Sequence, residues 1–599
     1  MILQALSRYY DRLIDQQAEG VAPVGYSPEK ISFEILLMPD GSLAQVNDIR
    51  DTSGKKPLPR ILNVPRAEKR TVGIKSNFMW DKTSYVLGVS NTSKRADKEH
   101  EAFLNLHEVA LTGEDDLGLK ALLNFLRDWS PEQFETLGFP PDMIDANIVF
   151  RLDGEHCYLH DRPMAKEVRS RLLTAEEGQE TEASEALCLV SGKLASAARL
   201  HPAIKGVNGA QSSGASIVSF NLEAFKSYGK DQGYNAPVSE KAAFAYTSAL
   251  NYLLRRGEHN RQRLQVGDTT LVFWAEAVDA GQAAEAENTL FALLNRPADD
   301  ASEAARVRAV LDRIAKGRPV ADLAPNLEPG TRMYMLGLAP NASRLSVRFW
   351  QVDTLDVFAR RIRQHQEDLH LDPLPWRTEP SVWRLVLAMA PSRDGRSKSE
   401  DVSPLMAGEF MRAIISGRSY PRSLLSNTIM RFRADGDISG LRVALCKGVL
   451  ARERRRNIRT SEEEIPVSLD KQSTQPGYLL GRLFAVLEHI QRAGLGGQLN
   501  ATIRDRFYGA ASATPASIFP VLLRNAQNHL GKLRKERMGQ AINLEKDIRE
   551  IVGSLPEEFP RSLKIEDQGR FAIGYYHQSQ SYFTRRDADG EKSEEPTDN

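Results

Sequence analysis

The chain is poor in cysteine, with only Cys157, Cys188 and Cys446 among its 599 residues. Because these three lie far apart and are odd in number, neither a disulfide framework nor a cysteine-based zinc site is expected. The chain also lacks any run of about 18 apolar residues, the length that a membrane-spanning helix needs. Residues 1–16 lack the basic region and the cleavage site of a signal peptide, and their spacing instead predicts an amphipathic helix. These absences predict a cytoplasmic protein.

Specific catalytic signatures are missing as well. The sequence contains no GxxxxGK(S/T) phosphate loop, no HExxH helix and no GxSxG nucleophile elbow. The tightest potential metal cluster falls in an expected hairpin whose alternation would place its members on both faces: His156, Cys157, His160 and Asp161. We therefore predict no enzyme activity, no metal site and no cofactor.

The chain also has no net charge, since 79 basic residues balance 79 acidic ones. The balance argues against a uniformly basic nucleic-acid-binding protein. The charges are nevertheless segregated: residues 50–98 hold twelve Lys or Arg against four acids, and residues 410–460 hold twelve against three. Such segregation can produce a basic groove on a neutral particle.

Apolar patterning predicts an α+β fold. Residues 31–37, 269–274, 332–338 and 344–350 alternate as strands do, and residues 217–220 are a short strand candidate. Residues 239–256 read as a helix with Ser239 as its N-cap. From about residue 376 the strand pattern gives way to helical patterns at 380–390, 402–416, 421–434 and 438–456. We expect a mixed N-terminal and middle region with antiparallel sheet elements, followed by an all-helical C-terminal bundle.

The same patterns suggest five parts. Residues 1–200 form an N-terminal α+β domain, and residues 201–375 form a middle α+β region with a glycine-rich loop. Residues 376–465 form a basic helical region, and residues 466–584 form a C-terminal helical bundle. Residues 585–599 are acidic and expected to be disordered.

Two polar segments are candidates for contacts with nucleic acid. Residues 73–82, GIKSNFMWDK, interleave cations, an amide and aromatic rings, with Lys75 and Asn77 as the candidate contacts. A buried strand with solvated lysines is the alternative. Residues 206–214, GVNGAQSSG, allow close backbone approach to phosphates or bases, and Asn208 and Gln211 carry amides suited to adenine edges. A flexible connector is the alternative for this loop.

Two groups of arginines are candidates for phosphate contacts. Arg344 and Arg348 lie opposite the expected apolar face of their strand, formed by Leu345, Val347 and Phe349. In an unbroken strand they would lie about 13 Å apart, the span of a few phosphates. A solvated face paired with acids is the alternative. The second group ends a predicted helix, where cations also favour the helix dipole: Arg452, Arg454, Arg455, Arg456 and Arg459.

Several segments together resemble one family. They are residues 80–81 followed by 85–88, residues 218–221 with 228–229 and 235–240, residues 341–350, and residues 2–6 with 9–10. These segments are similar to the large subunit of type I-C CRISPR-associated Cascade complexes, the Csd1 family. The resemblance extends from residue 1 to about residue 582, and the 341–350 and 218–240 blocks are its most specific parts.

The resemblance implies a role in antiviral defence. Family members recognise the protospacer-adjacent motif (PAM) as duplex DNA, help to open it, hold the displaced strand of the R-loop and recruit a helicase-nuclease. The implied partners are the subunit that binds the crRNA 5′ handle, the backbone filament, the target DNA and the helicase-nuclease. A metal-dependent nuclease and a purely architectural subunit without DNA contact are the alternatives, although we find no PD…(D/E)xK arrangement of carboxylates.

The resemblance also implies that residues 466–584 match the small subunit of related complexes. In the family this part is also produced separately, from an internal translation start. No methionine lies between Met430 and Met538, so such a start would need a non-AUG codon, with Val467 as the candidate. An ordinary C-terminal domain made once is the alternative.

Overall fold

The computed structural model describes residues 1–52, 57–68, 70, 73–179, 186–257, 260–295, 309, 313, 326–393, 396–456, 464–496 and 500–589. Two compact units are present. Unit 1 is Met1–Gly206 with Ser212–Arg255, and unit 2 is Val207–Gln211 with Arg256–Asn599. The domain division predicted from the sequence is finer than these two units and stays a prediction. Among the described residues, no helix is long and apolar enough to cross a membrane.

The sheet of unit 1 follows the alternation of the sequence. Its strand order is β3-β2-β6-β5, with β2 antiparallel to β3 and parallel to β6. Phe33, Ile35 and Leu37 of β2 are buried in one cluster with apolar residues of α3 and α4, whereas Glu34 faces the other way and binds Asn47. The bounds are β2 Phe33–Leu37, β3 Leu43–Asp48, β5 Trp80–Lys82, β6 Asn147–Leu152, α3 Ala96–Leu111 and α4 Leu117–Asp128.

Smaller elements complete unit 1. A ribbon of β1 (Tyr26–Ile31) and β4 (Arg60–Pro65) packs Ile31 and Val64 against Trp80 and Val149. The predicted amphipathic helix is α1 (Ile2–Asp15), which packs against α7 (Glu240–Leu254), and Ser239 caps α7 as expected. The remaining elements are α2 Thr83–Val86, α5 Gln133–Thr136, α6 Pro163–Gln179, β7 Ala186–Leu187, β8 Leu194–Ala195 and the 3-10 turns Pro141–Met143, Leu159–Asp161, Glu223–Phe225 and Gln232–Asn235.

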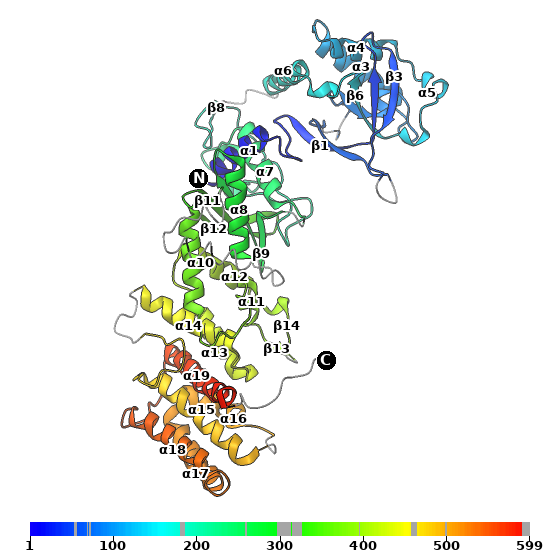
Figure 1. Cartoon of the computed structure of the whole chain (residues 1–599). Coiled ribbons are helices and arrows are strands. Elements are labelled where there is room, and N and C mark those ends of the chain that lie inside the picture. The colour runs from blue at the N-terminus through cyan, green and yellow to red at the C-terminus, as the bar shows by residue number, and fades with distance from the viewer. Residues whose placement is uncertain are drawn as a thin grey trace. The chain divides into compact units, whose positions relative to one another are not determined.

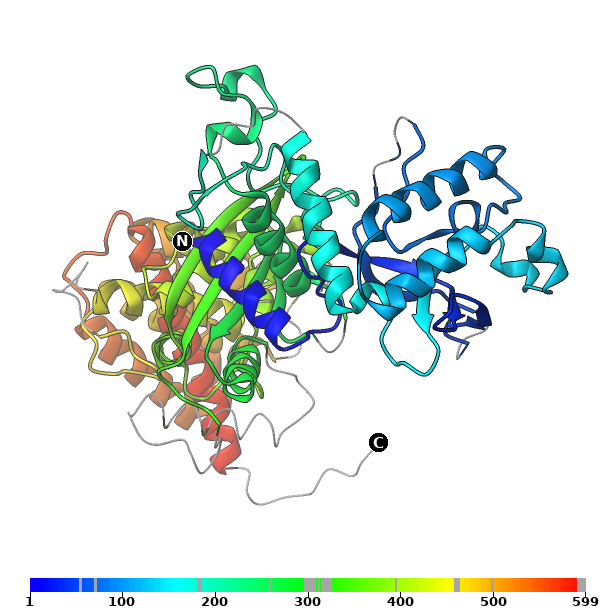
Figure 2. The same cartoon turned by 90° about the horizontal axis from the view of Figure 1, so that it is seen from above.

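Unit 2 begins with an antiparallel sheet of order β12-β11-β10-β9, whose long strands lie side by side in Figure 2. One face buries Phe273, Met335 and Phe349 against helices α8 and α10. The other face carries a stack of three rings, with Tyr334 lying 5.2 Å from Trp274 and 5.5 Å from Trp350 between ring centroids. The bounds are β9 Arg263–Val266, β10 Thr269–Glu276, β11 Arg332–Asn341, β12 Arg344–Thr354, α8 Ala280–Leu294 and α10 Leu355–Leu369.

Two details of the strand predictions are wrong. Residues 217–220 form bends and extended chain, and among the described residues no strand pairs with them. In β12 the register shifts, since Gly337 pairs with Phe349 while Leu338 pairs with Val347. Arg348 is the extra residue of this bulge, so the alternation breaks and Val347 is 37% exposed instead of joining the core.

The helical patterns predicted after residue 376 are confirmed. The helices are α11 Val382–Leu387, α12 Pro404–Ser416, α13 Arg422–Asp435 and α14 Gly440–Arg455, followed by α15 Pro476–Leu495, α16 Ile503–Ala513, α17 Pro515–Glu536, α18 Met538–Gly553 and α19 Ile565–Asp589 (Figure 1). Between α11 and α12 the described residues also form a small hairpin of two short strands, β13 (Ser392–Arg393) and β14 (Arg396–Ser397), and a 3-10 turn, Ser399–Asp401. Residues 590–599 of the predicted acidic tail lie outside the described residues.

Helices α15 and α19 pack backbone to backbone. A Cβ atom added at Gly481 would lie 2.0 Å from the carbonyl oxygen of Phe571, and one at Gly574 would lie 2.1 Å from that of Tyr478. Gly477 meets Asp567 and Gly481 meets Phe571, so the two helices run parallel. Only glycine permits such an approach.

Candidate nucleic-acid interface

The segment with Lys75 and Asn77 lies in unit 1, between β4 and β5. Lys75 is exposed, and its carbonyl oxygen accepts a hydrogen bond from Arg70 Nε at 2.7 Å. Asn77 is only 3% exposed. Its side-chain oxygen accepts from the Glu68 backbone amide at 2.9 Å, and its backbone amide donates to the Asp81 carboxylate at 2.9 Å. Asn77 therefore orders the segment, and Lys75 is the member of the pair that faces solvent.

The loop Val207–Gln211 is anchored on the sheet of unit 2. The backbone amide of Asn208 donates to Thr270 Oγ1 at 3.2 Å, and Gly209, with φ of 75°, lies against Pro340 of β11. The side chains of Asn208 and Gln211 are exposed. The backbone of this loop is thus held in place while two amide groups face solvent.

Arg344 lies close to this loop. Pro340 pairs with Leu345 across the turn at the tip of β11 and β12, and Asn341 pairs with Arg344. The structure therefore brings the Val207–Gln211 loop and Arg344 to the same end of the sheet. Arg348 lies further along β12, where its Nη2 is 3.0 Å from Asp268 Oδ2. This ion pair offsets the charge of Arg348.

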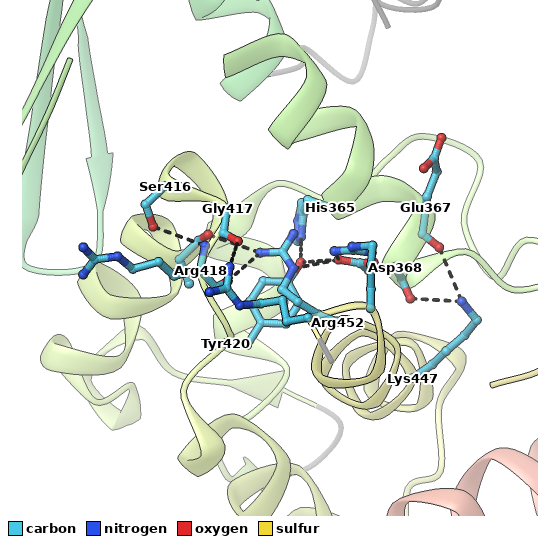
Figure 3. Close-up of polar contacts among 12 residues, drawn as sticks. His365, Glu367, Asp368, Ser416, Gly417, Arg418, Tyr420, Lys447 and Arg452 are labelled. Atoms are coloured by element: carbon cyan, nitrogen blue, oxygen red, sulfur yellow. Dashed lines mark hydrogen bonds and ion pairs between the residues drawn. The ribbon is translucent and has the colours of Figure 1, made fainter. Parts of the chain in front are cut away.

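Two of the arginines at the end of α14, Arg452 and Arg455, bind one buried carboxylate, that of Asp368, which Figure 3 shows beside Arg452. Arg452 and Asp368 are each 1% exposed, and Arg452 Nε donates to Asp368 Oδ2 at 2.8 Å. Arg455 forms a two-pronged ion pair with the same carboxylate. Arg456 is exposed and donates to the Gly417 carbonyl at 2.9 Å, and Arg454 is half-buried. Arg459 lies outside the described residues.

Arg452 is also held by groups from the α12–α13 region. Its Nη1 donates to the carbonyls of Ala413 and Arg418 at 3.2 Å, and its guanidinium lies 3.8 Å from the centroid of the Tyr420 ring. A phosphate could not reach this side chain without breaking the network. The solvent-facing cations of the group are Arg455 and Arg456.

Two further ionisable groups border Asp368. His365 Nδ1 lies 2.6 Å from the Tyr420 hydroxyl, and burial together with Arg452 lowers the pKa of His365 to about 3. Lys447 Nζ donates to the Asp368 carbonyl at 3.0 Å, and burial lowers the pKa of Lys447 to about 8. The network thus ties α10, the segment after α12, and α14 together.

The His365 environment predicts acid sensitivity. A histidine whose pKa falls from 6.5 to about 3 on folding binds fewer protons in the folded state, so its stabilising contribution is full above pH 6.5 and is lost as the pH falls toward 3. Between pH 6.5 and 5 the loss from this residue is about 2 kcal/mol, at about 1.4 kcal/mol per pH unit. Urea unfolding of the full chain at pH 7 and pH 5 should show a smaller difference for His365→Phe than for the unaltered chain. The buried residue His577 also loses stabilisation on acidification, but it does so equally in both proteins. If the two proteins lost the same free energy of unfolding between pH 7 and pH 5, His365 would not be a source of the acid sensitivity.

The C-terminal bundle adds exposed cations that point outward from α17. Arg524, Lys532 and Lys535 share one helix face, and Arg537 follows directly. We name these four residues the basic ridge. Three other cations of the bundle are engaged: Arg482 is buried and pairs with Glu550 at 3.0 Å, Arg492 pairs with Glu488 at 2.8 Å, and Arg534 pairs with Glu545.

Within the described ranges, no group of three or more His, Cys, Asp and Glu residues is arranged to hold a metal ion. His160, from the cluster considered above, is buried and stacked on Tyr158, whereas Cys157 is exposed.

The family comparison covers both units. The model of the family described as CRISPR-associated protein (Cas_Csd1) matches residues 6–583. No curated protein matches the chain.

Proposed function

The chain belongs to the CRISPR-associated Csd1 family, and from this membership we propose that it is the large subunit of a type I-C Cascade complex. In that role it recognises the PAM in double-stranded DNA, helps to unwind the target, stabilises the displaced strand of the R-loop and recruits the helicase-nuclease. The match over residues 6–583 is the observation that carries the proposal, because it includes both units. The guide RNA would read the sequence by base pairing while the protein reads the motif, as in other RNA-guided systems.

For motif reading we favour the Val207–Gln211 loop of unit 2, and Lys75 of unit 1 is a separate candidate contact. A base-reading side chain must be both exposed and held at a defined position, since each good amide–adenine pair discriminates by about 1–3 kcal/mol. Asn208 and Gln211 meet this condition, because the loop backbone is fixed on Thr270 and Pro340. Asn77 is left out, because its side chain is buried and a base contact would require that side chain to leave its hydrogen bond with the Glu68 backbone amide.

For phosphate contacts we favour the cations that face solvent. Arg456 at the end of α14 and the basic ridge on α17 are exposed, and Arg455 is exposed as well, although it is paired with Asp368. Arg344, at the same end of the sheet as the motif loop, and half-buried Arg454 are further candidates. Arg348 would have to exchange Asp268 for a phosphate, and buried Arg452 supports its neighbours from within.

The motif and phosphate assignments predict different defects. In the assembled complex, Gln211→Ala should weaken binding to a target with the motif by about 1–3 kcal/mol and leave binding to a target without it unchanged. Arg456→Gln should weaken both alike and reduce the salt slope by about 0.9. Dissociation constants over a salt series distinguish these outcomes, with Gln16→Ala, an exposed glutamine after α1, as the matched control. Unchanged motif preference in Gln211→Ala would refute the motif assignment.

Two alternatives make contrary predictions for the same protein. A metal-dependent nuclease would cleave duplex DNA when Mg²⁺ or Mn²⁺ is added, and a variant of a carboxylate would abolish this activity. A purely architectural subunit, which makes no DNA contact, would not bind a short duplex at any salt concentration in the series. The proposed recognition subunit binds DNA with strong salt dependence and does not cleave it.

The proposed partners include a second form of the bundle. A start at Val467 would yield residues 467–599, which contain α15 to α19. In the full chain α19 also packs on α13 and α14, since Gly569 lies against Leu425 and Leu450. A separate copy would expose this face of α19. Intact-mass measurement of the complex expressed from the native gene tests for the fragment.

A further inference from the structure

The basic ridge lies at a defined end of the C-terminal bundle. Within the part of the chain that the structure describes, none of its four cations forms an ion pair, although they lie within 14 residues of one another: Arg524, Lys532, Lys535 and Arg537. Three of them, Lys532, Lys535 and Arg537, gather at the C-terminal end of α17. Unpaired cations packed this closely attract an anionic chain.

The end of α19 reaches the same end of the bundle. Helix α17 runs parallel to α15, because Phe484 meets Phe519 and Gly494 meets His529 further along. Helix α19 also runs parallel to α15, and Tyr582 stacks on His489 at 4.1 Å. From Tyr582 to Asp589 the helix advances by about 10 Å, at about 1.5 Å per residue. It therefore ends level with the last turns of α15 and α17.

The sequence that continues from this point is strongly acidic. Residues 590–599 contain four acidic residues against Lys592: Glu591, Glu594, Glu595 and Asp598. The ten residues after Asp589 can span up to about 33–36 Å when extended. Neighbouring packed helices lie about 8–10 Å apart, so the basic ridge is within reach.

We propose that the acidic segment 590–599 is an intramolecular competitor that occupies the basic ridge until single-stranded nucleic acid displaces it. The inference rests on the proposed strand contact of the ridge and adds its regulation. Occupancy by the segment would suppress binding to stray strands. Only a strand delivered at high local concentration, such as one displaced within an R-loop, would compete effectively.

The expected size of the effect follows from tethering. A short tether holds a competitor at an effective concentration of about 1 mM. Weak, non-specific electrostatic binding has a dissociation constant of about 0.1 mM at physiological salt. The ratio of these values implies that the segment lowers the apparent affinity for a strand by about tenfold. The effect should fade as salt rises, because both contacts are electrostatic.

The test uses the full chain and a fluorescent oligothymidylate, with binding measured by anisotropy over a salt series. Deletion of residues 590–599 should raise the affinity by about tenfold at low salt, consistent with the tethering ratio. E594Q/E595Q should raise it by a smaller factor in the same direction. The matched control is E557Q/E558Q, an exposed acidic pair in the loop after α18. This loop lies at the opposite end of the bundle, since the Pro560 carbonyl binds the Ala516 amide at the start of α17.

The variant K532Q/K535Q of the basic ridge distinguishes a failure of the proposed strand contact from a failure of the competitor proposal. If it binds the oligonucleotide as tightly as the unaltered chain, the proposed strand contact of the ridge is wrong. If K532Q/K535Q binds weakly, but deletion of residues 590–599 from the chain with the native ridge leaves the oligonucleotide affinity unchanged, the competitor proposal alone is overturned. An equal gain from E557Q/E558Q also overturns it, because net charge would then explain the effect. Support requires a gain from the deletion that disappears in K532Q/K535Q.

Discussion

Replacing Asp368 with alanine should lower the free energy of unfolding of unit 2 by about 3–5 kcal/mol, the usual cost of breaking a buried ion pair by removing one partner. Asp368 is 1% exposed and is the carboxylate shared by Arg452 and Arg455. Without it, the Arg452 guanidinium would keep only its carbonyl acceptors and the Tyr420 ring. An uncompensated buried charge is the reason for the large loss.

Asp356→Ala is the matched control for this prediction. Asp356 is the same residue type near the start of the same helix, α10, and pairs with exposed Arg360 at 2.7 Å. A pair of this kind contributes about 0.3–0.5 kcal/mol, so the control should lose less than about 1 kcal/mol. Urea unfolding of both variants at pH 7 measures the difference. Similar losses in the two variants would show that the Asp368 network does not stabilise unit 2 as described.

The arginine group shows where sequence reasoning reaches its limit. Four arginines within five positions indicate either phosphate contacts or favourable charges at a helix end, and the sequence leaves both open. The deciding residue, Asp368, lies 84 positions before Arg452. No local pattern connects the two, because their contact depends on how α10 packs against α14.

Periodicity predicted the secondary structure best where many residues repeat one pattern. The long strands β10, β11 and β12 and the helices from α12 to α14 lie where alternation and helical spacing placed them. The prediction of a strand at residues 217–220 was wrong, because an apolar pattern does not show whether a neighbouring strand is there to pair with. The bulge at Arg348 was equally invisible, since the shift arises from pairing with β11.

Within the candidate interface, solvent exposure distinguishes residues that can contact nucleic acid from residues that cannot, and residue type alone does not. The residue types of Lys75 and Asn77 suit nucleic acid equally well, yet Asn77 is buried in local hydrogen bonds. The anchoring of the glycine-rich loop on Thr270 and Pro340 requires the fold. The sequence does carry one signal of close helix contact: Gly477 and Gly481 stand four residues apart on one helix face.

That glycine contact carries the second large prediction, because the parallel run of α15 and α19 depends on it. A Cβ atom at position 481 would lie 2.0 Å from the Phe571 carbonyl oxygen and 2.8 Å from the Tyr575 amide nitrogen. Both atoms belong to the backbone of α19, so no side chain can rotate away to make room. The whole helix would have to move.

Gly481→Ala should therefore destabilise unit 2 by about 3 kcal/mol, the upper end of the usual cost of overpacking. This loss should appear even though alanine is intrinsically the better helix former by about 1 kcal/mol. Gly531→Ala, in the interior of α17, is the matched control: its added Cβ meets no atom within 4 Å, so it should stabilise the chain by about 1 kcal/mol. Urea unfolding of the two variants should thus shift in opposite directions. A gain in stability from Gly481→Ala would mean that α15 and α19 do not pack backbone to backbone, and the alignment of the α17 and α19 ends, on which the competition at the basic ridge depends, would lose its support.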